Sequence, residues 1–85
     1  MIDQKRFDTF KEVYTRMLTR AVTEHPEEYR YPISDVPAVV NRMMTAIEHA
    51  SYNKDGYALR WTCRELGIKW TYGSINGYLH GYDNA

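Results

Sequence analysis

The sequence predicts an all-α protein: one domain over residues 1–85, folded as a compact bundle of three to four helices with a C-terminal helix-turn-helix-like hairpin. Three observations predict this class. Apolar residues recur at spacings of three and four, as on the buried face of a helix. Proline and glycine separate these stretches. No segment alternates apolar and polar residues long enough to form a strand.

The first helix is expected over residues 3–24, which contain neither glycine nor proline. Its apolar residues share one helical face: Phe7, Phe10, Tyr14, Met17, Leu18, Ala21 and Val22. Asp3 is a suitable N-cap. The helix should end at His25, because the residue before a proline avoids helical backbone.

The second helix is expected over residues 35–51. Asp35 is the expected cap, and Pro37 is tolerated in a first helical turn. The apolar residues that follow recur at helical spacing as far as Ala50, so this helix should bury one face against the first.

A third helix is expected over residues 57–66 and a fourth over residues 72–80. Gly67 stands where a helix commonly ends on a residue in the left-handed conformation. Thr71 is a suitable cap for the fourth helix. The C-terminal third is therefore expected to form two helices joined at a sharp corner.

Charge and composition exclude several kinds of protein. The chain has 11 Lys and Arg against 11 Asp and Glu, so any nucleic-acid contact needs a locally basic face. The one cysteine, Cys63, rules out a disulfide within the chain and a cysteine-rich zinc site. A lone thiol fits a reducing compartment, and no apolar run has the length of a membrane span. We expect a cytoplasmic protein.

Residues 58–79, which read as helix, glycine turn and helix, have the shape of a helix-turn-helix. The segment Leu66-Gly67-Ile68-Lys69 resembles the turn of many such motifs. The whole chain also resembles small accessory proteins encoded by bacteriophages and prophages, several of which end in a similar segment. The resemblance implies a bacterial host cell and assigns no activity. Gly73 stands where such motifs place an apolar anchor, and Ile75 follows two residues later, so the turn is expected to be longer or differently wound.

Cationic and aromatic residues gather around this corner. Arg and Lys suit phosphate contact, aromatic rings suit base stacking, and polar side chains of a recognition helix can reach base edges. The same residue types are also over-represented in protein-binding hot spots. The alternatives are a solvated helix face and a hairpin that only closes the core. The candidate contacts to DNA or a protein partner are Arg60, Arg64, Lys69, Trp70, Tyr72, Ser74 and Asn76.

Two further groups are candidate interfaces. Gly73, Gly77 and Gly81 are four apart, a spacing that lets another backbone approach closely, either the first helix or a second subunit. Tyr29 and Tyr31 lie between the first two helices and, with Tyr52, are expected to cover one end of the bundle or to form an interaction surface.

Nothing in the sequence predicts catalysis. The three histidines lack metal-ligand spacing, and Cys63 lies on the inner stripe of its helix. We expect no cofactor, no metal, no membrane association and no small-molecule substrate. The leading hypothesis is a small phage-type accessory protein that associates with DNA. The alternative is a module that binds and blocks or redirects a host enzyme or defence complex, and the third is a structural homodimer.

Overall fold

The computed structural model describes residues 1–53 and 56–82, which form four α-helices, one short 3-10 helix and no strand. The helices are α1 (Gln4–Glu24), α2 (Val36–Glu48), α3 (Tyr57–Leu66) and α4 (Tyr72–Leu79), with the 3-10 helix η1 (Ile33–Asp35) before α2. The predicted all-α bundle is confirmed.

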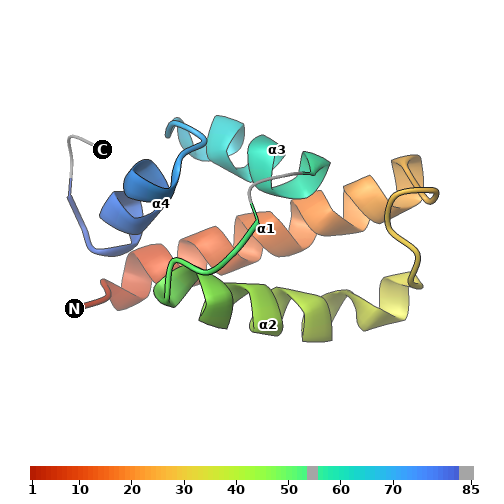
Figure 1. The fold of residues 1–85 in the computed structure, drawn as a ribbon, viewed down its shortest axis with the longest axis horizontal. Helices are drawn as coiled ribbons and strands as arrows, with labels where there is room; N and C mark the ends of the chain where they lie inside the picture. The colour runs from red at the N-terminus through yellow and green to blue at the C-terminus, as the bar shows by residue number, and fades with distance from the viewer. Residues whose placement is uncertain (54–55, 83–85) are drawn as a thin grey trace.

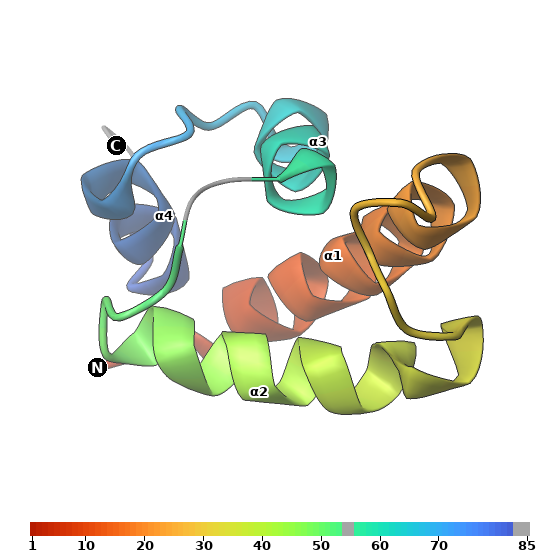
Figure 2. The same ribbon diagram turned by 45° about the vertical axis from the view of Figure 1, so that its right-hand side comes forward.

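The long helix α1 is the axis on which the other helices pack. Figure 1 shows α2 returning antiparallel to α1 on one side and α3 lying along its other side. The shorter α4 packs against α1 and α2, near the N-terminus of the chain. Among the described residues, α3 and α4 make little contact with each other, and Figure 2 shows the connecting segment arching between them. Because α3 and α4 both pack against α1, this helix fixes the positions of the two helices on either side of the Gly67 corner.

The core draws on all four α-helices. Phe10 and Leu18 of α1, Ile47 of α2, Cys63 of α3 and Ile75 of α4 are almost completely buried in one cluster. Burial of this apolar surface is the main force that holds the four helices together. The charged residues of α1, α2 and α3 lie outside this core, and α4 has none.

Three helix ends form as the sequence predicts. The Asp3 carboxylate accepts a hydrogen bond from the Arg6 backbone nitrogen (3.2 Å) and caps α1. The Thr71 hydroxyl accepts from the Ser74 nitrogen (3.1 Å) and caps α4. Gly67 is left-handed, with φ 71°, and directs the chain out of α3. The sharp corner between α3 and α4 is confirmed.

The predicted ends of α2 are wrong in two respects. Asp35 makes no capping hydrogen bond, because η1 already gives it helical backbone (φ −86°, ψ −9°) and a cap needs an extended one. The helix ends at Glu48 rather than at residue 51. Ala50 is left-handed, with φ 51°, and the Ser51 nitrogen donates to the Ala46 carbonyl (3.0 Å), which closes the helix end early.

The end of α4 lies one residue before the predicted position, at Leu79. Gly81, with φ 83°, reverses the chain there. The Asp3 nitrogen donates to the Leu79 carbonyl (2.7 Å), and the Arg6 guanidinium donates to the Tyr78 and Tyr82 carbonyls, both at 3.3 Å. The start of α1 thus caps the end of α4 and fixes its position.

Candidate functional site

The outer face of α3 carries the predicted cations. Arg60 and Arg64 lie one turn apart and are both exposed, while the opposite face of α3 is buried against the core. Lys69 is exposed just beyond the Gly67 corner. The amphipathic pattern of α3 therefore places Arg60 and Arg64 outside, and Lys69 is exposed in the segment that follows the helix.

A stacking contact joins α3 to the corner segment. The guanidinium carbon of Arg60 lies 4.6 Å from the centroid of the Trp70 ring, within the range of a cation–π interaction. Trp70 is half-buried, and its indole nitrogen is buried with no hydrogen-bond partner in the described part of the chain. Trp70 therefore turns its polar group inward, and Arg60 covers a face of its ring. The structure thus brings together two of the candidate residues, Arg60 and Trp70.

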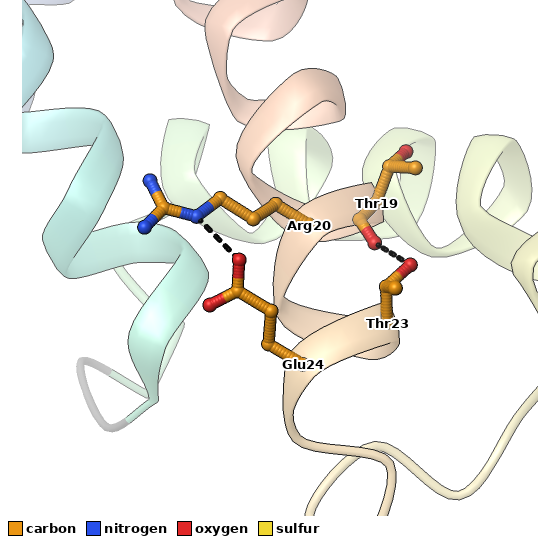
Figure 3. Close-up of polar contacts among 4 residues, drawn as sticks. All are labelled: Thr19, Arg20, Thr23 and Glu24. Atoms are coloured by element: carbon orange, nitrogen blue, oxygen red, sulfur yellow. Dashed lines mark hydrogen bonds and ion pairs between the residues drawn. The ribbon is translucent and has the colours of Figure 1, made fainter.

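A second pair of the same kind joins α3 to α1. The guanidinium carbon of Arg20 lies 4.4 Å from the centroid of the Trp61 ring. Figure 3 shows Arg20 extending from α1 toward α3, with its Nε donating to the Glu24 carboxylate (2.9 Å). Arg20 was not among the predicted residues. No local pattern identifies it, because its partner belongs to a helix far away in the sequence.

The positive charge on this face has no ion-pair partner in the part of the chain that the structure describes. Within residues 1–53 and 56–82, neither Arg60, Arg64 nor Lys69 forms an ion pair. Glu65, the acidic residue of α3, pairs instead with Arg16 of α1 at 3.8 Å. A chain with 11 positive and 11 negative residues thus carries a locally basic face on α3 and the corner. We call Arg60, Arg64 and Lys69, with the ring of Trp70, the α3 face.

Helix α4 offers few groups to a partner. Ser74 is buried, with 6% of its surface exposed, so it cannot make the predicted surface contact. Asn76 is half-buried, and Gly73 is exposed but has no side chain. Tyr72 is 39% exposed, yet its hydroxyl donates to the Tyr52 carbonyl (2.6 Å). The residues predicted on α4 therefore do not extend the α3 face as a row of polar side chains.

The three candidate glycines have three different environments. Gly73 is exposed, with no atom within 4 Å of the position that a Cβ would take. Gly77 is buried. Gly81 lies beyond α4, where a Cβ would lie 3.3 Å from an Asp3 carboxylate oxygen. These glycines do not line one exposed ridge.

Tyr29 and Tyr31 lie together at one end of the bundle, half-buried and packed against the core. Their rings meet edge to face at 6.3 Å. Burial, with Tyr31 and Tyr29 nearby, raises the pKa of the Tyr14 hydroxyl beneath them well above its usual value. Tyr52, expected in the same cluster, instead packs against Tyr72 at 4.6 Å. Tyr29 and Tyr31 thus cover the bundle end without Tyr52.

The described residues offer little acid–base or metal chemistry. Cys63 is 1% exposed, and burial raises the pKa of its thiol to about 12, so the thiol stays protonated at neutral pH. No group of three or more His, Cys, Asp and Glu side chains in residues 1–53 and 56–82 is placed to hold a metal ion. A hollow of about 280 Å³ beside α2 has Val39, Met43 and Ala46 in its lining.

No protein family, curated protein or solved structure matches the chain. No helix in the described part of the chain has the length and apolar character needed to cross a membrane.

Proposed function

We propose that the chain is a non-enzymatic binding module, a small phage-type accessory protein that associates with nucleic acid through the α3 face. One observation carries the proposal: Arg60, Arg64 and Lys69 are exposed and have no acidic partner among the described residues, in a chain whose formal charges cancel. Three exposed cations on one helix and on the turn that follows it suit the phosphates of an anionic polymer.

The side chains suit phosphate groups. Residues one helical turn apart have their Cβ atoms about 6 Å apart, so Arg60 and Arg64 can reach neighbouring phosphates along one strand. The planar fork of a guanidinium donates two parallel hydrogen bonds to phosphate oxygens. Stacking on Trp70 holds Arg60 in place before binding, which lowers the entropy that binding would otherwise lose.

In the proposed function, α4 has a structural role. Its last turn is held by Asp3 and Arg6 of α1, and Ser74 is buried. A recognition helix needs exposed polar side chains that reach base edges. Contacts from α3 and the corner go mainly to phosphates, so we expect binding with weak sequence preference.

A protein-binding module is the second candidate, favoured by the two Arg–Trp pairs. Arg, Trp and Tyr dominate binding hot spots, and both pairs border α3. A partner with an acidic surface, such as a host enzyme or a defence complex, would contact the same three cations. The homodimer is not proposed, because the described glycines form no continuous exposed seam.

Fluorescence anisotropy with labelled DNA tests the proposal. The wild-type chain should bind at micromolar concentration, and affinity should fall steeply between about 50 and 200 mM salt. The triple variant Arg60→Gln, Arg64→Gln, Lys69→Gln should lose binding. The matched control is the triple variant Lys5→Gln, Arg30→Gln, Arg42→Gln, which removes the same charge from exposed positions outside the α3 face. This control should keep most of the DNA binding of the wild-type chain.

Two outcomes would overturn the proposal. The first is no salt-dependent binding by the wild-type chain. The second is an equal loss in both triple variants, because net charge rather than the α3 face would then control binding. Retention of an acidic protein by the wild-type chain, with no DNA binding, would instead support the second candidate.

A further inference from the structure

We infer that the α3 face holds unpaired nucleic-acid strands in preference to duplex. This inference rests on the proposed function and names the form of its ligand. Two independent features of the structure support it. Neither α3 nor α4 is suited to enter a groove, and the α3 face is bordered by planar groups on which a base can stack once it is unpaired.

Helix α4 has too few exposed side chains to read a groove. Ser74, Ile75, Gly77 and Leu79 are buried, and Gly73 has no side chain. Duplex DNA shows its sequence only through the base edges in its grooves. A helix that buries half of its eight residues and exposes a glycine cannot make such contacts.

Helix α3 is blocked from a groove by its neighbours. A helix with its side chains is about 10–12 Å across and nearly fills a major groove of about 12 Å. Along α3, Arg20 and Arg16 of α1 contact Trp61 and Glu65. Trp70 of the corner segment lies against Arg60. Insertion of α3 would bring α1 and the corner segment against the groove walls.

Planar groups border the cations of the α3 face. Trp61 and Trp70 are half-buried, and each has a guanidinium over a ring face, at 4.4 and 4.6 Å. The Tyr57 ring lies 5.5 Å from Trp61 and stacks on His25 at 3.7 Å. A base can stack on a guanidinium, or on the ring that remains when the guanidinium moves to a phosphate.

In a duplex the flat faces of the bases are stacked on neighbouring base pairs, so only an unpaired strand can offer them to the aromatic rings of the protein. Each base that stacks on an aromatic ring contributes about 1–3 kcal/mol, which corresponds to about fivefold to 150-fold in affinity. Phosphate contacts are available from both forms. A single stacked base is therefore enough to make the strand the tighter ligand.

The test uses a labelled thymidine oligomer of about 12 nucleotides and a duplex of the same length, each titrated at the same salt. We expect the strand to bind at least about fivefold more tightly than the duplex. We also expect the strand, and not the duplex, to quench tryptophan fluorescence. Trp70→Leu and Trp61→Leu should each weaken strand binding by a larger factor than duplex binding, because only the strand loses a stacking surface, with circular dichroism checking that each variant is folded.

The possible results distinguish a failure of the strand preference from a failure of the proposed function. Equal binding of both forms, or tighter binding of duplex, would overturn the inference and leave the proposed function standing. Binding of neither form would overturn both. The comparison of strand with duplex uses the wild-type chain, so it remains decisive even if a tryptophan variant fails to fold.

Discussion

The hydroxyl oxygen of Tyr29 lies 2.8 Å from the backbone nitrogen of Tyr57 and accepts its hydrogen bond. It also accepts from the Ala58 nitrogen at 3.3 Å. The residue at the cap position, Gly56, has no side chain to do this and has a positive φ of 117°, which suits glycine. A tyrosine from the loop after α1 therefore caps α3, the helix that carries the proposed binding face.

Replacing Tyr29 with Phe should lower the free energy of unfolding by about 1–2 kcal/mol. The ring would remain packed, but two backbone N–H groups at the start of α3 would lose their acceptor. Urea denaturation followed by circular dichroism measures the change.

The matched control is Tyr31→Phe. Tyr31 is also half-buried and packs beside Tyr29, but its hydroxyl makes no hydrogen bond in the described structure. Loss of the Tyr31 hydroxyl should lower the free energy of unfolding much less than loss of the Tyr29 hydroxyl. Equal effects from the two substitutions would contradict the capping role.

Replacing Ala50 with Gly should stabilise the protein by about 1 kcal/mol. Ala50 adopts φ 51°, a left-handed conformation that strains an alanine and suits a glycine. Thermal unfolding measures the effect. The control Ala38→Gly, at an exposed position inside α2, should instead destabilise the protein. A lower melting temperature for Ala50→Gly would contradict the prediction.

Stability should fall as pH rises above 9. Burial raises the pKa of Cys63 from 9.0 to about 12, so above pH 9 the thiol ionises in the unfolded chain and stays protonated in the folded one. The raised pKa values of Tyr14 and Tyr52 act in the same direction at higher pH. The contribution of the protonated Cys63 thiol to the free energy of unfolding is therefore fully present below pH 9 and declines progressively toward pH 12.

Urea titrations at several pH values check this linkage. The variant Cys63→Ala should be less stable at neutral pH, because it leaves a cavity, but its stability should decline less steeply between pH 9 and 11. The same slope in both proteins would show that ionisation of Cys63 does not contribute.

Local sequence signals predicted the features that depend on local structure. The apolar spacing of α1 and α3, the Asp3 and Thr71 caps and the Gly67 corner each depend on residues within one or two turns. The Asp35 cap failed because the preceding 3-10 turn changes its backbone. Ala50 could not be foreseen in a left-handed conformation that glycine usually takes.

The candidate site was predicted only in part, because some of its contacts join segments that are far apart in the sequence. Arg60 and Arg64 follow from the helical spacing of α3. The Arg20–Trp61 and Tyr29–Tyr57 contacts join segments far apart in the sequence, and no pattern of residue spacing encodes them. The burial of Ser74 follows from how α4 packs on α1 and α2, which its own residues do not determine.

The salt dependence of strand binding tests the central claim most directly. Arg64 is exposed and makes no stacking or ion-pair contact among the described residues, so Arg64→Gln removes one charge from the α3 face without disturbing packing. The account predicts weaker binding and a plot of log affinity against log salt that is shallower by about 0.7. An unchanged slope and affinity would contradict it.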